Sequence, residues 1–383
     1  MMLHFTEGEF AARREKLSAA MSERGLDAML LFSQESMYWL TGYDTFGFCF
    51  FQCLIYKQNG EMALLTRSAD LRQAHHTSNI SNIVIWKDGA NANPATDLRD
   101  LAAEMDLLGT TIGVEYDSPG LTAGNGKKVD EKMMTFAELK EASDVVHQLR
   151  VIKSAEEIKY IRKAAHMADD ALDAAIKHTR AGADEGKILA AMQGVIFEQG
   201  GDYAGNEFII GSGEDALLCR YKSGRRKLSK NDQLTLEWAG ASAHYHAAMM
   251  RTLIVGKPKP EHEKLFTAAR DALLAVEAAM VPGNTFGDVF AAHAKVMDAA
   301  GLSRHRLNAC GYSLGARFAP CWMDGPMFYS NNPAVIEPNM SLFAHMIIMD
   351  SESNTAMTLG QTYLTTAKKP KNLSKHAMDM VVL

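Results

Sequence analysis

The sequence predicts a two-domain protein, with an α/β domain at the N-terminus followed by a larger α+β domain. The chain has 383 residues, more than one ordinary hydrophobic core holds and enough for two domains. Before residue 150, short apolar runs alternate with helical segments. After it, a pair of helices followed by strands occurs twice. We therefore expect domains at 1–150 and 151–383, the second with an internal duplication.

The first domain opens with an amphipathic helix on which Phe10, Leu17 and Met21 share a face. A second helical segment runs from Pro94 to Leu108. The apolar runs, each short enough for one strand, are Asp27–Phe32, Cys49–Tyr56, Met62–Leu65, Ile83–Trp86 and Thr111–Glu115. Strands that alternate with helices are typical of a small α/β domain.

The second domain begins with a helix that Ser154 and Glu157 start, because their spacing is that of a capping box. Apolar residues then recur at helical spacing as far as Leu172. Further helices are expected over 184–198, 260–281 and 286–300, and a closing set of strands over 308–366. The tail from Lys368 is basic and then apolar, which favours a docking strand or a frayed end.

Composition limits the function classes. The chain is 47% hydrophobic and 22% charged, with a net charge of −6, so we expect no nucleic-acid partner. Its first residues lack the pattern of a signal peptide, and the longest apolar run, Phe46 to Tyr56, is too short to span a bilayer. Five cysteines, an odd number without paired metal spacing, favour reduced thiols. The sequence predicts a soluble cytoplasmic protein without a membrane partner.

The stretch 234–252 has the pattern of a β-hairpin, with a strand, a turn at Gly240 and a second strand that ends in Arg251-Thr252. Two further segments, Gly311–Gly315 and Glu337–Met340, follow it at regular distances. Together with the entry segment Leu149–Arg162, these motifs resemble the creatinase and prolidase superfamily in order and spacing. The resemblance covers most of 150–366 and implies a creatinase-type N-terminal α/β domain and a pita-bread catalytic domain.

The resemblance also implies where a metal would bind. The family carries two aspartates eleven residues apart on the hairpin, and this chain has Glu237 and Ala248 there. The family's metal-binding histidine corresponds to Tyr312 and a glutamate to His345, while the last glutamate falls near Leu359 or Gly360. A divalent ion needs several converging ligands, and alanine supplies none. The sequence thus predicts no metal and no other cofactor, which argues against ordinary prolidase chemistry.

Metal-free creatinase is a second comparison within the superfamily. The catalytic histidine of creatinase corresponds to Arg220, and its two glutamates correspond to Met250 and His345, so creatine hydrolysis is not favoured. Longer motifs resemble a third, metal-free branch, the ectoine hydrolases: Gly213–Arg226, His244–His246, Phe318–Met327 and Phe343–Met346. Gly325 and Gln361 depart from that pattern, which leaves the substrate preference open.

This resemblance implies a metal-independent hydrolase that opens the cyclic amidine ring of ectoine to N-acetyl-2,4-diaminobutyrate in compatible-solute catabolism. A deacetylase acting downstream is the one further partner that such a product calls for. Glu237 is the candidate nucleophile or general base. His246 and His345 are candidates for moving protons to the ring nitrogens, and Tyr312 is a candidate polar group in the place of a metal ligand.

The substrate is a small zwitterion, so binding residues of both signs are expected. Arg220 would pair with its carboxylate. Asp324 and Trp322 would hold the amidinium by charge and by stacking, and His244 is a further candidate for the pocket wall. In the resembling family the N-terminal domain of one subunit reaches its partner's active site near Phe46–Phe51. Phe48 and Gln52 are therefore predicted to line the pocket across a homodimer.

Each candidate also has a structural interpretation. Glu237 could be an ion-paired acid, His246 and His345 satisfied core histidines, and Tyr312 a filler of volume. Arg220 could pair with Asp215, and the aromatic run Phe46–Phe51 could be a buried strand. Two other functions stay open: another C–N hydrolase, creatinase-like or Xaa-Pro peptidase-like, and a non-catalytic protein that binds small zwitterions or a protein partner. The polar groups retained at former catalytic positions favour catalysis.

Overall fold

The structure is a computed structural model that describes residues 3–220 and 225–383. The chain forms two compact units, Met1–Arg150 and Val151–Leu383. Residues 221–224, part of the Gly213–Arg226 motif, lie outside the described residues. No helix in the described part is long and apolar enough to cross a membrane.

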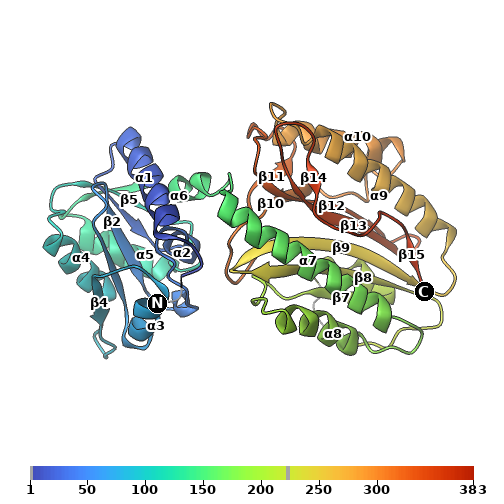
Figure 1. Cartoon of the computed structure of the whole chain (residues 1–383), viewed down its shortest axis with the longest axis horizontal. Helices are drawn as coiled ribbons and strands as arrows, with labels where there is room; N and C mark the ends of the chain where they lie inside the picture. Colours follow the sequence, from blue (N-terminus) through green and yellow to red (C-terminus); the bar gives the residue numbers. More distant parts are fainter. Residues whose placement is uncertain (1–2, 221–224) are drawn as a thin grey trace. The chain divides into compact units, whose positions relative to one another are not determined.

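The N-terminal unit is a six-stranded mixed sheet with the strand order β4-β3-β2-β1-β5-β6 (Figure 1). Its strands are β1 (Ala28–Leu31), β2 (Cys53–Lys57), β3 (Met62–Arg67), β4 (Ile83–Trp86), β5 (Thr111–Val114) and β6 (Glu138–Glu141). Its helices are α1 (Glu7–Arg24), α2 (Gln34–Thr41), α3 (Leu71–Thr77), α4 (Pro94–Glu104), α5 (Ala123–Met133) and α6 (Asp144–Leu149), with 3-10 turns η1 (Gly47–Cys49) and η2 (Ser68–Asp70).

Both faces of this sheet are covered. Along β1, Ala28 and Leu30 pack into one hydrophobic core, and Met29 and Leu31 pack into another on the opposite face. A strand buried on both faces is a continuous apolar run, and such a run is what the sequence shows. The predicted amphipathic helix is confirmed as α1, which buries Phe10, Leu17 and Met21.

The C-terminal unit, over its described residues, has a nine-stranded sheet whose main path is β11-β10-β12-β13-β9-β8-β7. Its strands are β7 (Ile209–Ser212), β8 (Asp232–Ser242), β9 (Tyr245–Val255), β10 (Ala309–Ser313), β11 (Asp324–Tyr329), β12 (Ser341–Asp350), β13 (Thr355–Leu364), β14 (Lys371–Asn372) and β15 (Val381–Val382). Its helices are α7 (Ala155–His178), α8 (Glu185–Glu198), α9 (Pro260–Ala279) and α10 (Phe286–Ala299), with the 3-10 turn η3 (Gly213–Leu217).

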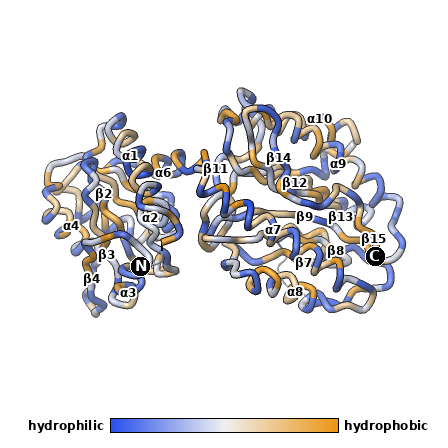
Figure 2. Tube along the Cα trace, in the orientation of Figure 1, coloured by the Kyte–Doolittle hydropathy of each residue, from blue (hydrophilic) through white to orange (hydrophobic). Residues whose placement is uncertain are grey.

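The helices cover the sheet in two pairs, which is the duplicated order that the sequence suggests. Helix α7 packs on β8 and β9, and α9 packs on β12 and β13 (Figure 1). The capping box at the start of α7 is confirmed, because Glu157 N–H donates to Ser154 Oγ and Ser154 N–H donates to the Glu157 carboxylate. Along α9 and α10, hydrophobic and hydrophilic stretches alternate (Figure 2), as in helices that bury one face.

The hairpin differs from its prediction in the place of its turn. Strands β8 and β9 are joined at Ala243 and His244, both with positive φ (49° and 62°), so the turn lies three residues beyond Gly240. Gly240 is a strand residue instead, because a Cβ there would lie 2.0 Å from the Ala164 carbonyl oxygen of α7. The glycine permits close helix packing rather than a turn.

The aromatic segment also differs from the predicted buried strand. Strand β2 starts only at Cys53, and the residues before it form η1. Thr45 Oγ1 donates to Asp70 and accepts from Gly47 N–H, and such local side-chain bonds compete with strand pairing. Two aromatic rings consequently stay outside the core, since Phe46 is 77% exposed and Phe50 is 49% exposed.

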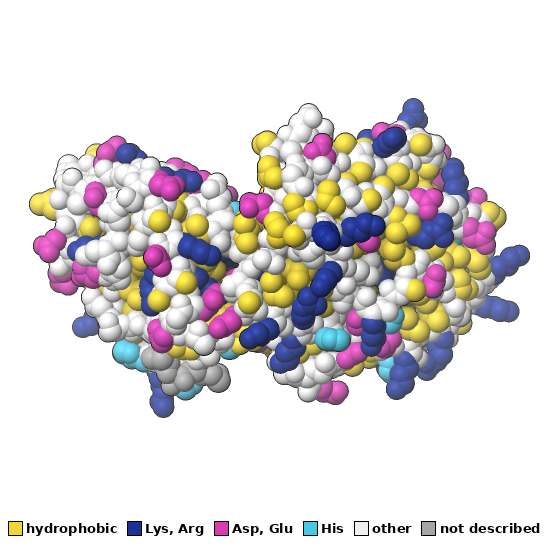
Figure 3. Space-filling view, turned by 45° about the horizontal axis from the view of Figure 1, so that its top comes forward, with side chains coloured by type: hydrophobic (Ala, Val, Ile, Leu, Met, Phe, Trp, Pro, Cys, Tyr) yellow, Lys and Arg dark blue, Asp and Glu magenta, His cyan; other side chains and the backbone are white. Residues whose placement is uncertain are grey.

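The tail is a docking strand. Val381 and Val382 pair in parallel with Leu253 and Ile254 of β9. Upstream, Asp169 of α7 accepts from Ser374 Oγ at 2.5 Å and from Lys375 N–H at 2.8 Å. On the face drawn in Figure 3, acidic and basic side chains are interspersed over the C-terminal unit.

Candidate active site

Four residues form one cross-strand row in the sheet of the C-terminal unit. Glu237 of β8 lies opposite Met250 of β9. Met250 lies opposite Gly360 of β13, and Gly360 lies opposite His345 of β12. Residues directly opposite each other on paired strands point to the same face of a sheet. The register therefore places Glu237 and His345 on one face, three strands apart.

Tyr312 connects the two ends of this row. It lies in β10 opposite Phe343, its hydroxyl donates to Glu237 Oε1 at 3.4 Å, and its ring centroid lies 5.6 Å from that of His345. The indole Nε1–H of Trp322 donates to the same hydroxyl at 2.9 Å. The structure thus brings together four of the predicted site residues.

The Glu237 carboxyl lies in an environment that favours its neutral form. Burial raises its pKa to about 7, although the nearby charge of Arg220 and the Tyr312 hydrogen bond act in the opposite direction. Burial also raises the pKa of Tyr312 well above its ordinary value, so Tyr312 remains a hydrogen-bond donor. A carboxyl that titrates near neutrality can accept a proton in one step and return it in another.

His345 is buried with a ring nitrogen to spare. Its Nδ1 has no hydrogen-bond partner among residues 3–220 and 225–383. Burial lowers the pKa of its imidazole to about 3, with the neighbouring His293 contributing in the same direction. His345 is thus a neutral imidazole with one nitrogen available to a ligand.

His246 has backbone partners at both ring nitrogens, and its predicted role as a proton carrier stays a prediction. Its Nε2 accepts from Gly205 N–H at 2.9 Å, and its Nδ1 lies 3.4 Å from the Gly315 carbonyl oxygen. Burial lowers its pKa to about 4. With both ring nitrogens engaged by the backbone, His246 fits the alternative of a satisfied core histidine that positions the segments around Gly205 and Gly315.

Three other predicted site residues also have partners within the protein. Trp322 is buried, and two of its groups have partners. Its indole N–H donates to Tyr312, and its backbone N–H donates to Asn206 Oδ1. Asp324 Oδ1 lies 3.8 Å from Arg317 Nη1, so a substrate amidinium would share that carboxylate with an arginine. His244 stacks on Phe318 at 4.1 Å and, as a turn residue, does not follow the strand alternation expected for it.

Arg220 is an exposed residue, and its positive charge acts to lower the pKa of Glu237. In the described ranges no ion pair joins it to Asp215, the structural partner considered for it. The guanidinium is thus placed to meet an anionic group that approaches Glu237.

Phe48 and Gln52 are buried within the N-terminal unit, and their place in the pocket of a partner subunit stays a prediction. Gln52 is 1% exposed, and its amide donates to Gln34 Oε1 at 2.8 Å and accepts from the Tyr43 hydroxyl at 3.3 Å. Phe48 is 7% exposed. The exposed aromatic residues of this segment are Phe46 and Phe50.

The residues do not fit a metal ion. Nowhere in the described part of the chain do three His, Cys, Asp or Glu side chains converge as ligands. At the family's ligand positions, the Ala248 methyl is buried, Gly360 has no side chain, and the Tyr312 hydroxyl already bonds to Trp322. Only Glu237 and His345 keep donor atoms, and two ligands do not hold a divalent ion.

Two residues that support the site were missed in the sequence. Gly205 holds His246 through its backbone N–H, and Asn206 holds the backbone of Trp322. These contacts join positions that are 41 and 116 residues apart. No local pattern marks them, since one uses only the main chain.

With this geometry, the comparisons with known proteins identify the family. Residues 159–367 match the metallopeptidase family M24, and residues 13–152 match the creatinase/prolidase N-terminal domain. The chain belongs to the M24 family and is a hydrolase of its creatinase group; the predicted fold class is confirmed.

Individual relatives differ in what they act on. An ectoine hydrolase from Halomonas elongata is 28% identical over 88% of this chain and 89% of its own length. A Xaa-Pro dipeptidase from Pyrococcus furiosus is 22% identical over 79% of this chain and 82% of its own. Among solved structures, a prolidase from Thermococcus sibiricus aligns with a TM-score of 0.88 at 20% identity over 98% of this chain and 99% of its own, which shows the shared fold.

Proposed function

We propose that this protein hydrolyses the cyclic amidine of ectoine without a metal ion. The observation that carries the proposal is Glu237, a carboxyl with a raised pKa that keeps hydrogen-bonding capacity, at a position where the family binds metal. The similarity to an ectoine hydrolase supports the same substrate.

The chemistry needs a base and a site for a cation. A bound amidinium favours the ionised form of Glu237, because an opposite charge nearby stabilises the carboxylate. The carboxylate then takes a proton from water, whose oxygen adds to the amidinium carbon. One carbon–nitrogen bond of the resulting tetrahedral intermediate breaks as Glu237 returns the proton to the departing nitrogen. Direct attack by Glu237 on the same carbon is the alternative route.

The neighbours of Glu237 assist in three ways. Tyr312 donates to the carboxylate and fixes its orientation. The free nitrogen of His345 is suited to accept a hydrogen bond from a ring N–H of the substrate. Arg220 is suited to the substrate carboxylate, because its guanidinium binds carboxylates through two parallel hydrogen bonds. We place Glu237 and Tyr312 at the reacting atoms and Arg220 at the binding end.

The test is to incubate the purified protein with ectoine and follow ring opening by NMR, with Glu237→Gln as the control. We expect N-acetylated diaminobutyrate to accumulate only with the wild type. Parallel incubations with an Xaa-Pro dipeptide and with creatine examine the other hydrolase functions. Turnover of either one without ectoine turnover would contradict the proposal, and ectoine line broadening without product would favour a zwitterion-binding protein.

We also propose a homodimer, in which the exposed Phe46 and Phe50 lie against a second copy of the chain. Phe46 is 77% exposed and Phe50 is 49% exposed, and contact with a second copy would remove their apolar surface from water. Sedimentation velocity should show a dimer that weakens in the Phe46→Ser/Phe50→Ser variant. A wild-type monomer at assay concentration would rule the dimer out.

A further inference from the structure

A cavity of about 570 Å³ lies beside the part of β8 that β7 does not pair with. Its lining comes from the second half of α8, from the segment 202–208 before β7, and from Ala239, Ala319 and Pro320. A cavity of this volume is typical of a small-molecule site. Glu237 and His345 are not among its lining residues, so this cavity is distinct from the candidate active site.

Two aromatic rings form one wall of this cavity. Phe197 of α8 and Tyr203 lie with their ring centroids 5.0 Å apart, at an interplanar angle of 64°. Phe197 is 41% exposed and Tyr203 is 83% exposed, so both rings offer surface to a ligand. The face of an aromatic ring carries partial negative charge and attracts cations. This wall therefore favours a positively charged ligand.

The ionisable groups of the cavity favour the same sign of ligand. Asp202 and Glu207 line it, and among the described residues no Lys, Arg or His does. Asp202 Oδ2 accepts from His244 N–H at 3.0 Å, which fixes the position of this carboxylate. A cation in the cavity would have two carboxylates nearby and no basic side chain of the lining to repel it.

The floor of the cavity selects among cations. Ile196, Phe208 and Ala239 line it with buried apolar side chains. A divalent metal ion needs several converging oxygen or nitrogen ligands, and no such cluster exists in the part of the chain that the structure describes. An ammonium ion that carries alkyl groups fits better, because its charge contacts the rings and carboxylates while its methyl groups contact the floor.

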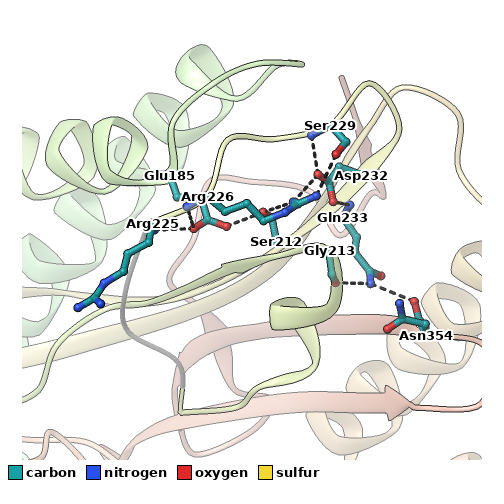
Figure 4. A network of polar contacts seen from close by, with 9 residues as sticks. All are labelled: Glu185, Ser212, Gly213, Arg225, Arg226, Ser229, Asp232, Gln233 and Asn354. Atoms are coloured by element: carbon teal, nitrogen blue, oxygen red, sulfur yellow. Dashed lines mark hydrogen bonds and ion pairs between the residues drawn. The ribbon is translucent and has the colours of Figure 1, made fainter.

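Another cavity in the same unit, of about 400 Å³, lacks this preference. Basic and acidic side chains both line it. Its Arg226 Nη1 donates to Ser212 Oγ and to Asp232 Oδ2, both at 2.6 Å (Figure 4). In the same network Gln233 Nε2 donates to the Gly213 carbonyl oxygen at 2.9 Å. These polar groups bond to one another, so this cavity provides a control and carries no ligand argument of its own.

We propose that the cavity beside β8 binds a small organic cation whose charge is carried by an alkylated ammonium group. Zwitterions are excluded by the same chemistry, because their carboxylate would lie close to Asp202 and Glu207. The site is therefore distinct from the one proposed for ectoine, and the proposal does not depend on that function.

The first experiment is isothermal titration of the wild-type protein with three probes: choline, its neutral isostere 3,3-dimethyl-1-butanol, and glycine betaine. The isostere has the shape of choline without the charge, and betaine adds a carboxylate to the same ammonium group. We expect choline to bind about 10-fold or more tightly than either, because only choline combines a cation with no anion. Its affinity should fall as salt is added.

The second experiment uses substitutions in the cavity. Tyr203→Leu keeps apolar bulk but removes the ring, and it should weaken choline binding by roughly 2- to 30-fold, whereas Tyr203→Phe should not. Asp202→Asn keeps an oxygen for His244 N–H but removes the charge, so it should weaken choline binding as well. Asp215→Asn is the matched control, because it removes the same charge from the half-buried lining of the other cavity, and should have no effect.

Four results would overturn the proposal. The wild type would fail to bind choline, or it would bind the neutral isostere equally well, which would leave only an apolar groove. Choline affinity would be the same in wild type, Tyr203→Leu and Asp202→Asn, which would place the cation elsewhere. Tyr203→Leu would weaken a dimer in sedimentation without changing choline affinity, which would make this surface a contact with a second copy. The choline titrations need no ectoine turnover, so the two proposals can fail separately.

Discussion

Among the described residues, one glutamate in each unit has a pKa that desolvation raises to about 7: the buried Glu115 in the N-terminal unit and the half-buried Glu237 in the C-terminal unit. Glu115 has three donors, since it accepts from Phe32 N–H at 3.0 Å, Ser33 N–H at 2.9 Å and Ser36 Oγ at 2.5 Å. Among residues 3–220 and 225–383, Glu237 has one, the Tyr312 hydroxyl at 3.4 Å. The two carboxyls share a pKa and differ in how many hydrogen bonds are already made.

This difference separates a structural acid from a candidate catalytic one. Glu115 uses both of its oxygens to join the end of β1 to α2, which leaves little capacity for a ligand. In the part of the chain that the structure describes, Glu237 keeps unused lone pairs, and on the same face of the sheet His345 Nδ1 has no hydrogen-bond partner. A perturbed pKa indicates only that a group is buried. Unused hydrogen-bond acceptor positions indicate, in addition, that a substrate can bind to it.

The sharpest way to break the comparison is to remove each charge in turn. Glu237→Gln should lower kcat for ectoine by roughly 10²–10⁴-fold, the usual range for loss of a general base. Glu115→Gln keeps one oxygen for its two N–H donors and should leave kcat unchanged within about twofold. Steady-state assays of both variants at pH 8 decide this. An equal loss in both would mean that the effect is a general one of buried charge.

His246 and His345 differ in the same way, because both ring nitrogens of His246 have partners whereas Nδ1 of His345 has none among the described residues. Both histidines are expected to make the fold less stable in acid. Burial depresses the pKa of His246 to about 4 and of His345 to about 3, so each stabilises the fold above its unfolded pKa of about 6.5, and this stability is lost as pH falls toward the folded value. The expected loss at pH 5 is roughly 2 kcal/mol for each histidine. Urea unfolding at pH 7 and pH 5 measures it.

Substitution tells the two histidines apart. His345→Gln should reduce the acid sensitivity with little effect on stability at pH 7, because its Nδ1 makes no bond among the described residues. His246→Gln should destabilise the protein at pH 7 as well, because it loses its contacts with Gly205 and Gly315. Equal stabilities for the two variants at pH 7 would contradict this assignment.

Part of this site could be predicted from the sequence. The spacing of the hairpin identified Glu237, and the motif order identified Tyr312 and His345, because strand registers preserve such spacings. The contacts of His246 could not be predicted, since they depend on backbone atoms of distant segments.

The fold was more predictable than its turns. The capping box of α7 and the apolar face of α1 are local patterns, and both are confirmed. The turn at Ala243–His244 was misplaced because Gly240 was taken for a turn residue, whereas contact with α7 requires that glycine. The segment from Phe46 to Phe51 departs from a strand because the Asp70 side chain, 25 residues from Thr45, stabilises the turn.

A second test of the glutamate pair uses pH-dependent stability. The folded pKa of Glu237 is raised from its ordinary 4.5 to about 7, so its contribution to stability is present below pH 4.5 and is lost as pH rises through 7. Glu237→Gln should remove that loss and reduce the fall in unfolding free energy between pH 5 and pH 8.5 by roughly 2 kcal/mol. Chemical denaturation at the two pH values provides the measurement. The same fall in wild type and variant would mean that Glu237 is solvated.

Substitution of Arg220 is expected to have a smaller effect on turnover, and to change KM more than kcat. Arg220→Ala should raise KM for ectoine by about 10-fold or more while kcat falls less, because a contact with the substrate carboxylate is made in ground and transition states alike. The acid limb of kcat/KM should also move to higher pH, since the guanidinium lowers the Glu237 pKa. Arg220→Lys keeps the charge but not the two parallel hydrogen bonds, so it should raise KM without moving the limb. A moved limb in the lysine variant would argue against a purely electrostatic link.

Removal of metal ions is expected to have no effect on kcat. A catalytic metal in this family would require the row from Glu237 to His345 to supply converging ligands, yet Met250 and Gly360 stand between them. Ala248, two positions from Met250 along β9 and opposite Ala239, supplies no ligand either. Exhaustive chelation should therefore leave kcat within experimental error, and elemental analysis of the active protein should find no stoichiometric ion. As a matched control, a prolidase of the family should lose activity under the same treatment. If chelation abolished the activity and one added metal restored it, Glu237 would be a metal ligand rather than a base. The smaller number of hydrogen bonds to Glu237 than to Glu115 would then have a different cause.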